Sequence, residues 1–176
     1  TTDVGPIIDA EAQDKLIAHK NYLDGFAKKI AEAPLDSSLL DTFFSSIAYE
    51  IDSLDRLKGE VFGPVLHVIR YAADKRDDVV AAINRTGFGL TFGLHSRLEG
   101  DFTNVAHKIT AGNIYINRSM IGATVGVQPF GGQGLSGTGP KAGGPHYLPR
   151  FATEQVVSIN TTATGGNIEL LTKAIV

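Results

Sequence analysis

Hydrophobic residues recur at helical spacing in the first part of the chain. Between residues 9 and 33, the apolar side chains with this spacing are Leu16, Leu23, Phe26, Ala27 and Ile30. Positions three and four apart lie on the same face of an α-helix. Pro6 precedes this segment and Pro34 ends it, because proline is tolerated at the start of a helix but not in its interior. We predict one long helix over 9–33.

The middle of the chain alternates between strand patterns and helix patterns. The predicted strands are 65–71, 90–95 and 113–117. The helix between the first two carries Val79, Val80 and Ile83, and the next helix carries Phe102, Val105, Ala106 and Ile109. Strands and helices that alternate with short connections are typical of an open α/β sheet. We therefore predict an α/β fold with an open, twisted, mainly parallel sheet and flanking helices.

The remaining segments have weaker patterns. Residues 35–58 are poorly patterned, and residues 118–150 form a long Gly-rich segment without periodicity. An irregular segment of that length in a compact domain is usually functional. Residues 154–160 alternate well enough for a late strand, and 167–176 have a weak helical pattern. We predict a domain over 1–150 and a tail over 151–176.

Composition excludes several classes of protein. The 176 residues carry a formal net charge of −3, which does not favour nucleic acid, where a basic patch is expected. The apolar runs are too short to cross a bilayer, and the first residues lack the features of a signal peptide. We expect a soluble, cytoplasmic protein, with peripheral membrane association left open for a longer parent chain.

The chain contains no cysteine, so it has no disulfide, thiolate metal site or cysteine nucleophile. Its five histidines are scattered without metal-ligand spacing, and we predict no metal site. Met120 is the only methionine, so we expect that translation of the protein does not begin at Thr1. We expect the chain to be a piece of a longer protein.

Two apparent motifs in the Gly-rich segment are misleading. Residues 132–137 match the dinucleotide pattern GxGxxG, but Pro129 precedes them and Pro140 follows them. A true fingerprint needs a strand before it and a helix after it, so that the helix N-terminus faces the pyrophosphate. Ser136 lies outside a nucleophile elbow and follows no strand, which makes a serine hydrolase a weak alternative.

Three segments, taken together, resemble the aldehyde dehydrogenase superfamily. They are TDVGPII at 2–8, EVFGPV at 60–65, and GVQPFGGQGLSG at 126–137, with GNIYINR at 112–118 just upstream. The segments at 49–54, 122–128 and 139–145 resemble the Δ1-pyrroline-5-carboxylate dehydrogenase branch, and within it the dehydrogenase module of bifunctional proline utilisation proteins. The resemblance implies a partial aldehyde dehydrogenase catalytic domain that serves the oxidation of glutamate semialdehyde to glutamate with NAD in proline catabolism.

The same resemblance assigns roles near the cofactor. The family forms a thiohemiacetal on a cysteine thiolate and then transfers a hydride to NAD. That cysteine and the general-base glutamate are expected upstream of Thr1, so no catalytic residue is assigned to this chain. Glu60 would accept hydrogen bonds from the ribose hydroxyls beside the nicotinamide, and Phe62 would pack near its ring. The alternatives are a solvated loop glutamate for Glu60 and a core position for Phe62.

For the substrate, the resemblance implies that backbone N–H groups of Gly122 and Ala123 hold the α-carboxylate of glutamate semialdehyde. Phe130 would flank its aliphatic stem. An ordinary turn and plain core packing are the alternatives. Asn117 is expected to brace the loop, and Arg118 is given no role.

The expected partners are glutamate semialdehyde, the upstream part of the same polypeptide, and a second copy of the chain, joined through the tail as a homo-oligomer. The tail at 154–162 resembles the arm that adds a strand to a neighbouring subunit in this family. FAD is expected only if a proline dehydrogenase module precedes the chain. Two other functions remain open: a non-catalytic assembly module of the same fold, and an aldehyde dehydrogenase with another substrate. In each case we expect the isolated chain to be inactive.

Overall fold

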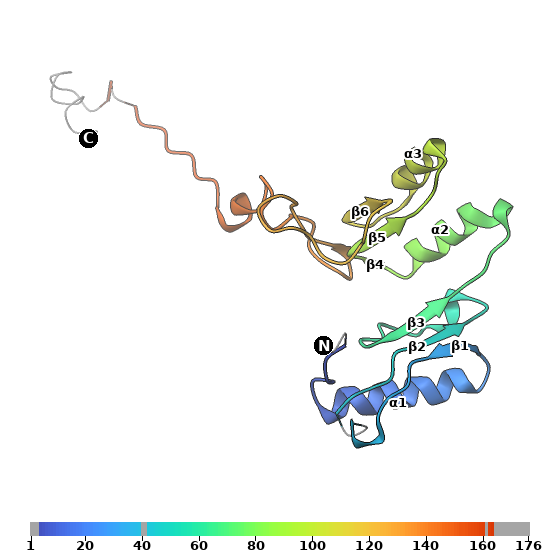
Figure 1. Cartoon of the computed structure of the whole chain (residues 1–176). Coiled ribbons are helices and arrows are strands. Elements are labelled where there is room, and N and C mark those ends of the chain that lie inside the picture. The colour runs from blue at the N-terminus through green and yellow to red at the C-terminus, as the bar shows by residue number, and fades with distance from the viewer. Residues whose placement is uncertain (1–3, 40–41, 161, 164–176) are drawn as a thin grey trace.

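A computed structural model describes residues 4–39, 42–160 and 162–163 (Figure 1). The helices are α1 Ala10–Asp24, α2 Arg76–Arg85 and α3 Glu99–Lys108. The strands are β1 Lys28–Glu32, β2 Ile47–Glu50, β3 Val65–Val68, β4 Phe88–Gly89, β5 Thr91–Leu94, β6 Asn113–Ile116 and β7 Gln133–Gly134. Short 3₁₀ helices cover Ser37–Leu39, Leu54–Arg56, Ala73–Lys75 and Leu148–Phe151.

The first helix is shorter than the sequence predicts. Its N-terminus is capped by Asp9, whose carboxylate accepts a hydrogen bond from the Ala12 N–H at 2.8 Å. It ends at Asp24, and Gly25 forms the C-cap. The prediction of a helix to residue 33 is wrong, since Lys28–Glu32 is strand β1. All five side chains of β1 are exposed, so no burial pattern marks it, and its pairing with β2 defines it.

The first layer of the fold consists of α1 and a three-stranded sheet beside it, in the order β1-β2-β3 (Figure 1). Strand β1 is antiparallel to β2, and β2 is parallel to β3 with Ile47 opposite Val65. Buried residues of α1, of β2 and of the position directly after β2 form a common core, made of Leu23, Ile47, Tyr49 and Ile51. Strand β2 lies in the stretch for which the sequence predicted no element.

A second layer contains α2, α3 and the parallel pair β5-β6 (Figure 1). Val80 of α2 packs with Val105 and Ile109 at the end of α3. These two helices and two strands lie where the sequence predicts them. The α/β class is confirmed, but the expectation that β3 shares a sheet with β5 and β6 is wrong. Strand β3 pairs with β2, which the prediction had missed, and within the described residues β5 pairs only with β6.

The Gly-rich segment is irregular, as predicted, except for β7 and the turn of 3₁₀ helix at Leu148–Phe151. Strand β7 pairs antiparallel with β4, placing Gln133 opposite Gly89. Residues 154–160 extend away from both layers and form no strand (Figure 1). A strand needs an edge to pair with, and this tail meets none in the described chain. The helix predicted over 167–176 lies outside the described residues.

The described helices include none whose length and apolar character would suit a membrane span.

Candidate functional site

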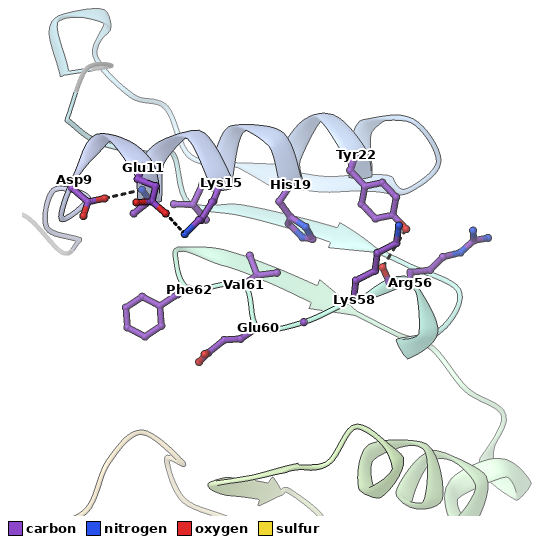
Figure 2. A pocket seen from close by; sticks show the side chains of 13 residues that line it. Asp9, Glu11, Lys15, His19, Tyr22, Arg56, Lys58, Glu60, Val61 and Phe62 are labelled. Atoms are coloured by element: carbon purple, nitrogen blue, oxygen red, sulfur yellow. Dashed lines mark hydrogen bonds and ion pairs between the residues drawn. The ribbon is translucent and has the colours of Figure 1, made fainter. Parts of the chain in front are cut away.

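The loop that carries Glu60 and Phe62 runs from the Leu54–Arg56 turn to β3. Together with α1 it encloses a hollow of about 650 Å³. Figure 2 shows Val61 pointing toward α1, whereas Glu60 and Phe62 point away from the helix. Gly63 brings the loop close to α1, because a Cβ at this position would lie 2.5 Å from the Leu16 Cδ2. The loop is thus held against α1 and presents two side chains outward.

Glu60 is an exposed carboxylate at the border of two hollows. It lines the one beside α1 and a second of about 690 Å³ that extends to α2, β4 and Ser136. Among the described residues, no protein group donates a hydrogen bond to it. Both carboxylate oxygens are therefore available to a ligand with two adjacent hydroxyl groups, since an ionised carboxylate only accepts hydrogen bonds.

Phe62 is 85 % exposed, so it is not a core residue of this chain. A large apolar side chain next to an available carboxylate suits a ligand that has a flat ring joined to a sugar. The nicotinamide end of NAD is a ligand of this kind, because it joins a flat ring to a sugar with two adjacent hydroxyl groups.

Sequence reasoning missed a histidine pair beside this loop. His19 of α1 and His67 of β3 approach with their Nε2 atoms 2.9 Å apart, and their rings meet edge to face. Burial lowers the pKa of His19 below its usual value. Burial, and then the charge of His19, lowers the pKa of His67. No local signal could reveal this pair, because 48 residues separate its members in sequence.

The second set of candidate residues lies after β6. Gly122 has a φ of 65°, in the left-handed region that favours glycine. Its neighbour Ala123 lines a hollow of about 370 Å³ with Phe130, Val125 and Ala142. The structure therefore places Ala123 and Phe130 at the same hollow, whereas their roles in substrate binding stay a prediction. Glu60 and Phe62 line a different hollow.

Phe130 is held by the backbone on either side of its hollow. Its N–H donates to the Ala142 carbonyl at 3.1 Å, and the Ala142 N–H donates back at 2.9 Å. Its ring is half-buried, which leaves part of it facing the hollow. The pairing fixes the backbone that carries this ring, and Phe130 lines the same hollow as Ala123.

Main-chain groups and the Gln128 side chain supply the polarity of this site. No charged residue or histidine occurs between Arg118 and Lys141. Within the described chain, the N–H groups of Gly122 and Ala123 donate to no protein acceptor, whereas the Thr124 N–H donates to the Gln128 Oε1 at 3.1 Å. Two successive N–H groups at a left-handed residue form a concavity that binds anions.

The neighbouring residues have structural roles. The Asn117 Oδ1 accepts a hydrogen bond from the Ser96 N–H, and its Nδ2 donates to the Ser96 carbonyl, each at 2.9 Å. These bonds tie the end of β6 to the turn after β5, and the bracing of the Gly-rich loop by Asn117 stays a prediction. The Ser136 hydroxyl accepts a hydrogen bond from the Gly89 N–H at 3.0 Å. The GxGxxG segment at 132–137 opens no helix, so its rejection as a dinucleotide fingerprint is confirmed. The part of the chain that the structure describes contains no cluster of metal-ligand side chains.

Comparison with known proteins places this geometry in a family. The model of the aldehyde dehydrogenase family matches residues 1–157. The chain is 53 % identical over 154 residues to bifunctional protein PutA of Rhizobium meliloti, covering 87 % of this chain and 13 % of that protein. It is 34 % identical over 158 residues to 1-pyrroline-5-carboxylate dehydrogenase of Geobacillus thermodenitrificans, covering 89 % of this chain and 30 % of the relative.

Solved structures agree with this result. A crystal structure of a mutant of proline utilization A from Bradyrhizobium japonicum superposes with a TM-score of 0.85 at 51 % identity, over 92 % of this chain and 16 % of the other. A 1-pyrroline-5-carboxylate dehydrogenase from Thermus, crystallised with bound NAD, gives a TM-score of 0.74 at 32 % identity, over 85 % and 29 %. The chain thus spans less than a third of each of these relatives, and it belongs to the aldehyde dehydrogenase family.

Proposed function

We propose that this chain is the C-terminal part of an NAD-dependent dehydrogenase that oxidises glutamate semialdehyde to glutamate in proline catabolism. The observation that carries the proposal is the pair of N–H groups at Gly122 and Ala123, which lack protein acceptors within the described chain. They lie in a loop without charged side chains, next to a hollow that Phe130 partly lines. The names of the relatives support the same substrate.

The substrate site suits a short aldehyde that carries a carboxylate. Backbone donors at Gly122 and Ala123 would bind the carboxylate, and the Phe130 ring would pack against the carbon chain. Binding at both places fixes the orientation of the molecule and so places its aldehyde end, which is how binding lowers the entropic part of a reaction barrier.

The cofactor end of the site uses Glu60 and Phe62. When bound, NAD accepts the hydride that leaves the aldehyde carbon. The Glu60 carboxylate would accept hydrogen bonds from the ribose hydroxyls, and the Phe62 side chain would pack against the adjoining ring. The chain contains no cysteine, so the thiolate that attacks the aldehyde must come from another part of the parent enzyme.

The test is Glu60→Gln in the full-length enzyme. A hydrogen bond to a charged group contributes about 1.5–3 kcal/mol, so we expect KM for NAD to rise roughly tenfold or more. The matched control is Glu11→Gln, because Glu11 is also exposed and lines the same hollow from α1. An unchanged KM for NAD in the Glu60 variant would reject the cofactor assignment. The 176-residue chain alone should show no turnover.

A further inference from the structure

Tyr115 links β6 to the loop that carries the proposed carboxylate site. Its side chain is 8 % exposed, and its hydroxyl donates a hydrogen bond to the Gly122 carbonyl at 3.1 Å. The Gly122 carbonyl lies immediately before the Ala123 N–H in the chain. Tyr115 therefore contacts the peptide group that would bind the substrate, but from the opposite side.

Because a peptide group is planar, this contact sets the direction of the Ala123 N–H bond. The Gly122 carbonyl and the Ala123 N–H belong to one planar peptide group, and the described chain contains no cis peptide bond. In a trans peptide, the C=O and N–H bonds point in opposite directions. A hydroxyl that holds the carbonyl on the β6 side therefore directs the Ala123 N–H away from β6.

The tyrosine is itself held in place. Tyr115 lies opposite Gly93 in the parallel pairing of β5 and β6. The Arg118 guanidinium lies 4.6 Å from the centroid of the Tyr115 ring. On the far side of Ala123, the Gln128 side chain accepts the Thr124 N–H. The loop is thus anchored before and after the donor, and the Ala123 N–H remains without a protein acceptor in the described chain.

We propose that Tyr115 is a positioning residue that directs the Ala123 N–H toward the carboxylate of the substrate. This inference rests on the proposed function. It gives Arg118 a role as well, since its guanidinium covers the face of the positioning ring. Tyr115 is buried behind the loop and contacts it through the Gly122 carbonyl, so it would act on the substrate through the loop.

The experiment is Tyr115→Phe in the full-length enzyme, assayed with glutamate semialdehyde and with propanal, which has no carboxylate. We expect KM for glutamate semialdehyde to rise five- to tenfold with kcat within twofold, and kcat/KM for propanal to stay unchanged. Tyr71→Phe is the matched control, because Tyr71 is exposed. This variant should leave KM and kcat unchanged for both aldehydes.

Each other outcome has a distinct meaning. If the Tyr115 variant loses activity equally toward both aldehydes, the hydroxyl has only a structural role and the inference is overturned. If the wild-type enzyme prefers glutamate semialdehyde and the variant keeps that preference, the inference is also overturned, while the proposed function stands. If the wild-type enzyme shows no preference for glutamate semialdehyde over propanal, the proposed function itself is rejected, and the inference about Tyr115 is rejected with it.

Discussion

Replacing Gly112 by alanine tests how closely the Gly-rich segment packs against β6. A Cβ at this position would lie 2.2 Å from the Gly131 carbonyl oxygen and 2.9 Å from the Gly132 Cα. These are backbone atoms, so neither can rotate away, and a normal contact requires a shift of about 1 Å. The same Gly131 carbonyl accepts a hydrogen bond from the buried Asn113 amide at 3.1 Å. Overpacking costs about 1–3 kcal/mol and the hydrogen bond contributes about 1 kcal/mol, so we expect a loss of roughly 2–4 kcal/mol.

The matched control is the same substitution at Gly100. This glycine lies in the first turn of α3, and a Cβ there would meet no atom within 4 Å. Alanine is favoured over glycine in helices by up to about 1 kcal/mol, so Gly100→Ala should stabilise the chain slightly. Urea unfolding followed by far-UV circular dichroism measures both changes. If the two variants shift the midpoint in the same direction, the described packing around Gly112 is wrong.

Two further changes test the first layer. Since burial keeps the pKa of His19 and His67 below the usual value, the unfolded chain takes up protons first as the pH falls. The stability that the pair contributes should therefore be complete above about pH 6.5 and be lost as the pH falls through 6.5 toward the folded-state values. Over this range, the urea midpoint of His67→Gln should depend less on pH than the midpoint of the wild-type chain. An equal pH dependence of the two midpoints would contradict the prediction. Leu23→Ala should lower the free energy of unfolding by about 2–5 kcal/mol, because Leu23 is fully buried between α1 and β2. Ile17→Ala, at an exposed position of the same helix, should change it by about 0.5 kcal/mol or less, and equal losses at the two positions would refute the packing.

Residue patterns predicted the second layer well and the first layer poorly. Helices α2 and α3 bury one face each, and β5 and β6 are runs of apolar residues between clear turn signals. Strand β2 buries Ile47 and Tyr49 on one face, but it is only four residues long and follows an irregular stretch. Strand β1 buries nothing, and only its ladder with β2 makes it a strand.

The candidate site was predictable where short motifs carry it. The segment EVFGPV located Glu60 and Phe62, and the loop after β6 located Ala123 and Phe130 in one hollow. What remained hidden depends on contacts across the fold. The His19–His67 pair joins a helix to a strand, and the Tyr115 hydroxyl reaches Gly122 only because the chain turns back after β6. Spacing along the sequence contains neither piece of information.

The uncharged loop between Arg118 and Lys141 has a consequence for how such a site changes in evolution. The anion donors proposed for it are main-chain groups, so truncating a side chain within the loop would remove none of them. Alanine scanning would pass over Gly122 and Ala123, since one lacks a side chain and the other is alanine already. The specificity of such a site changes when the backbone dihedral angles change, because these angles direct the N–H groups. Substitutions to or from proline and glycine, and insertions in the loop, are the changes that alter them. Replacing the Ala123 amide by an ester would remove the donor itself.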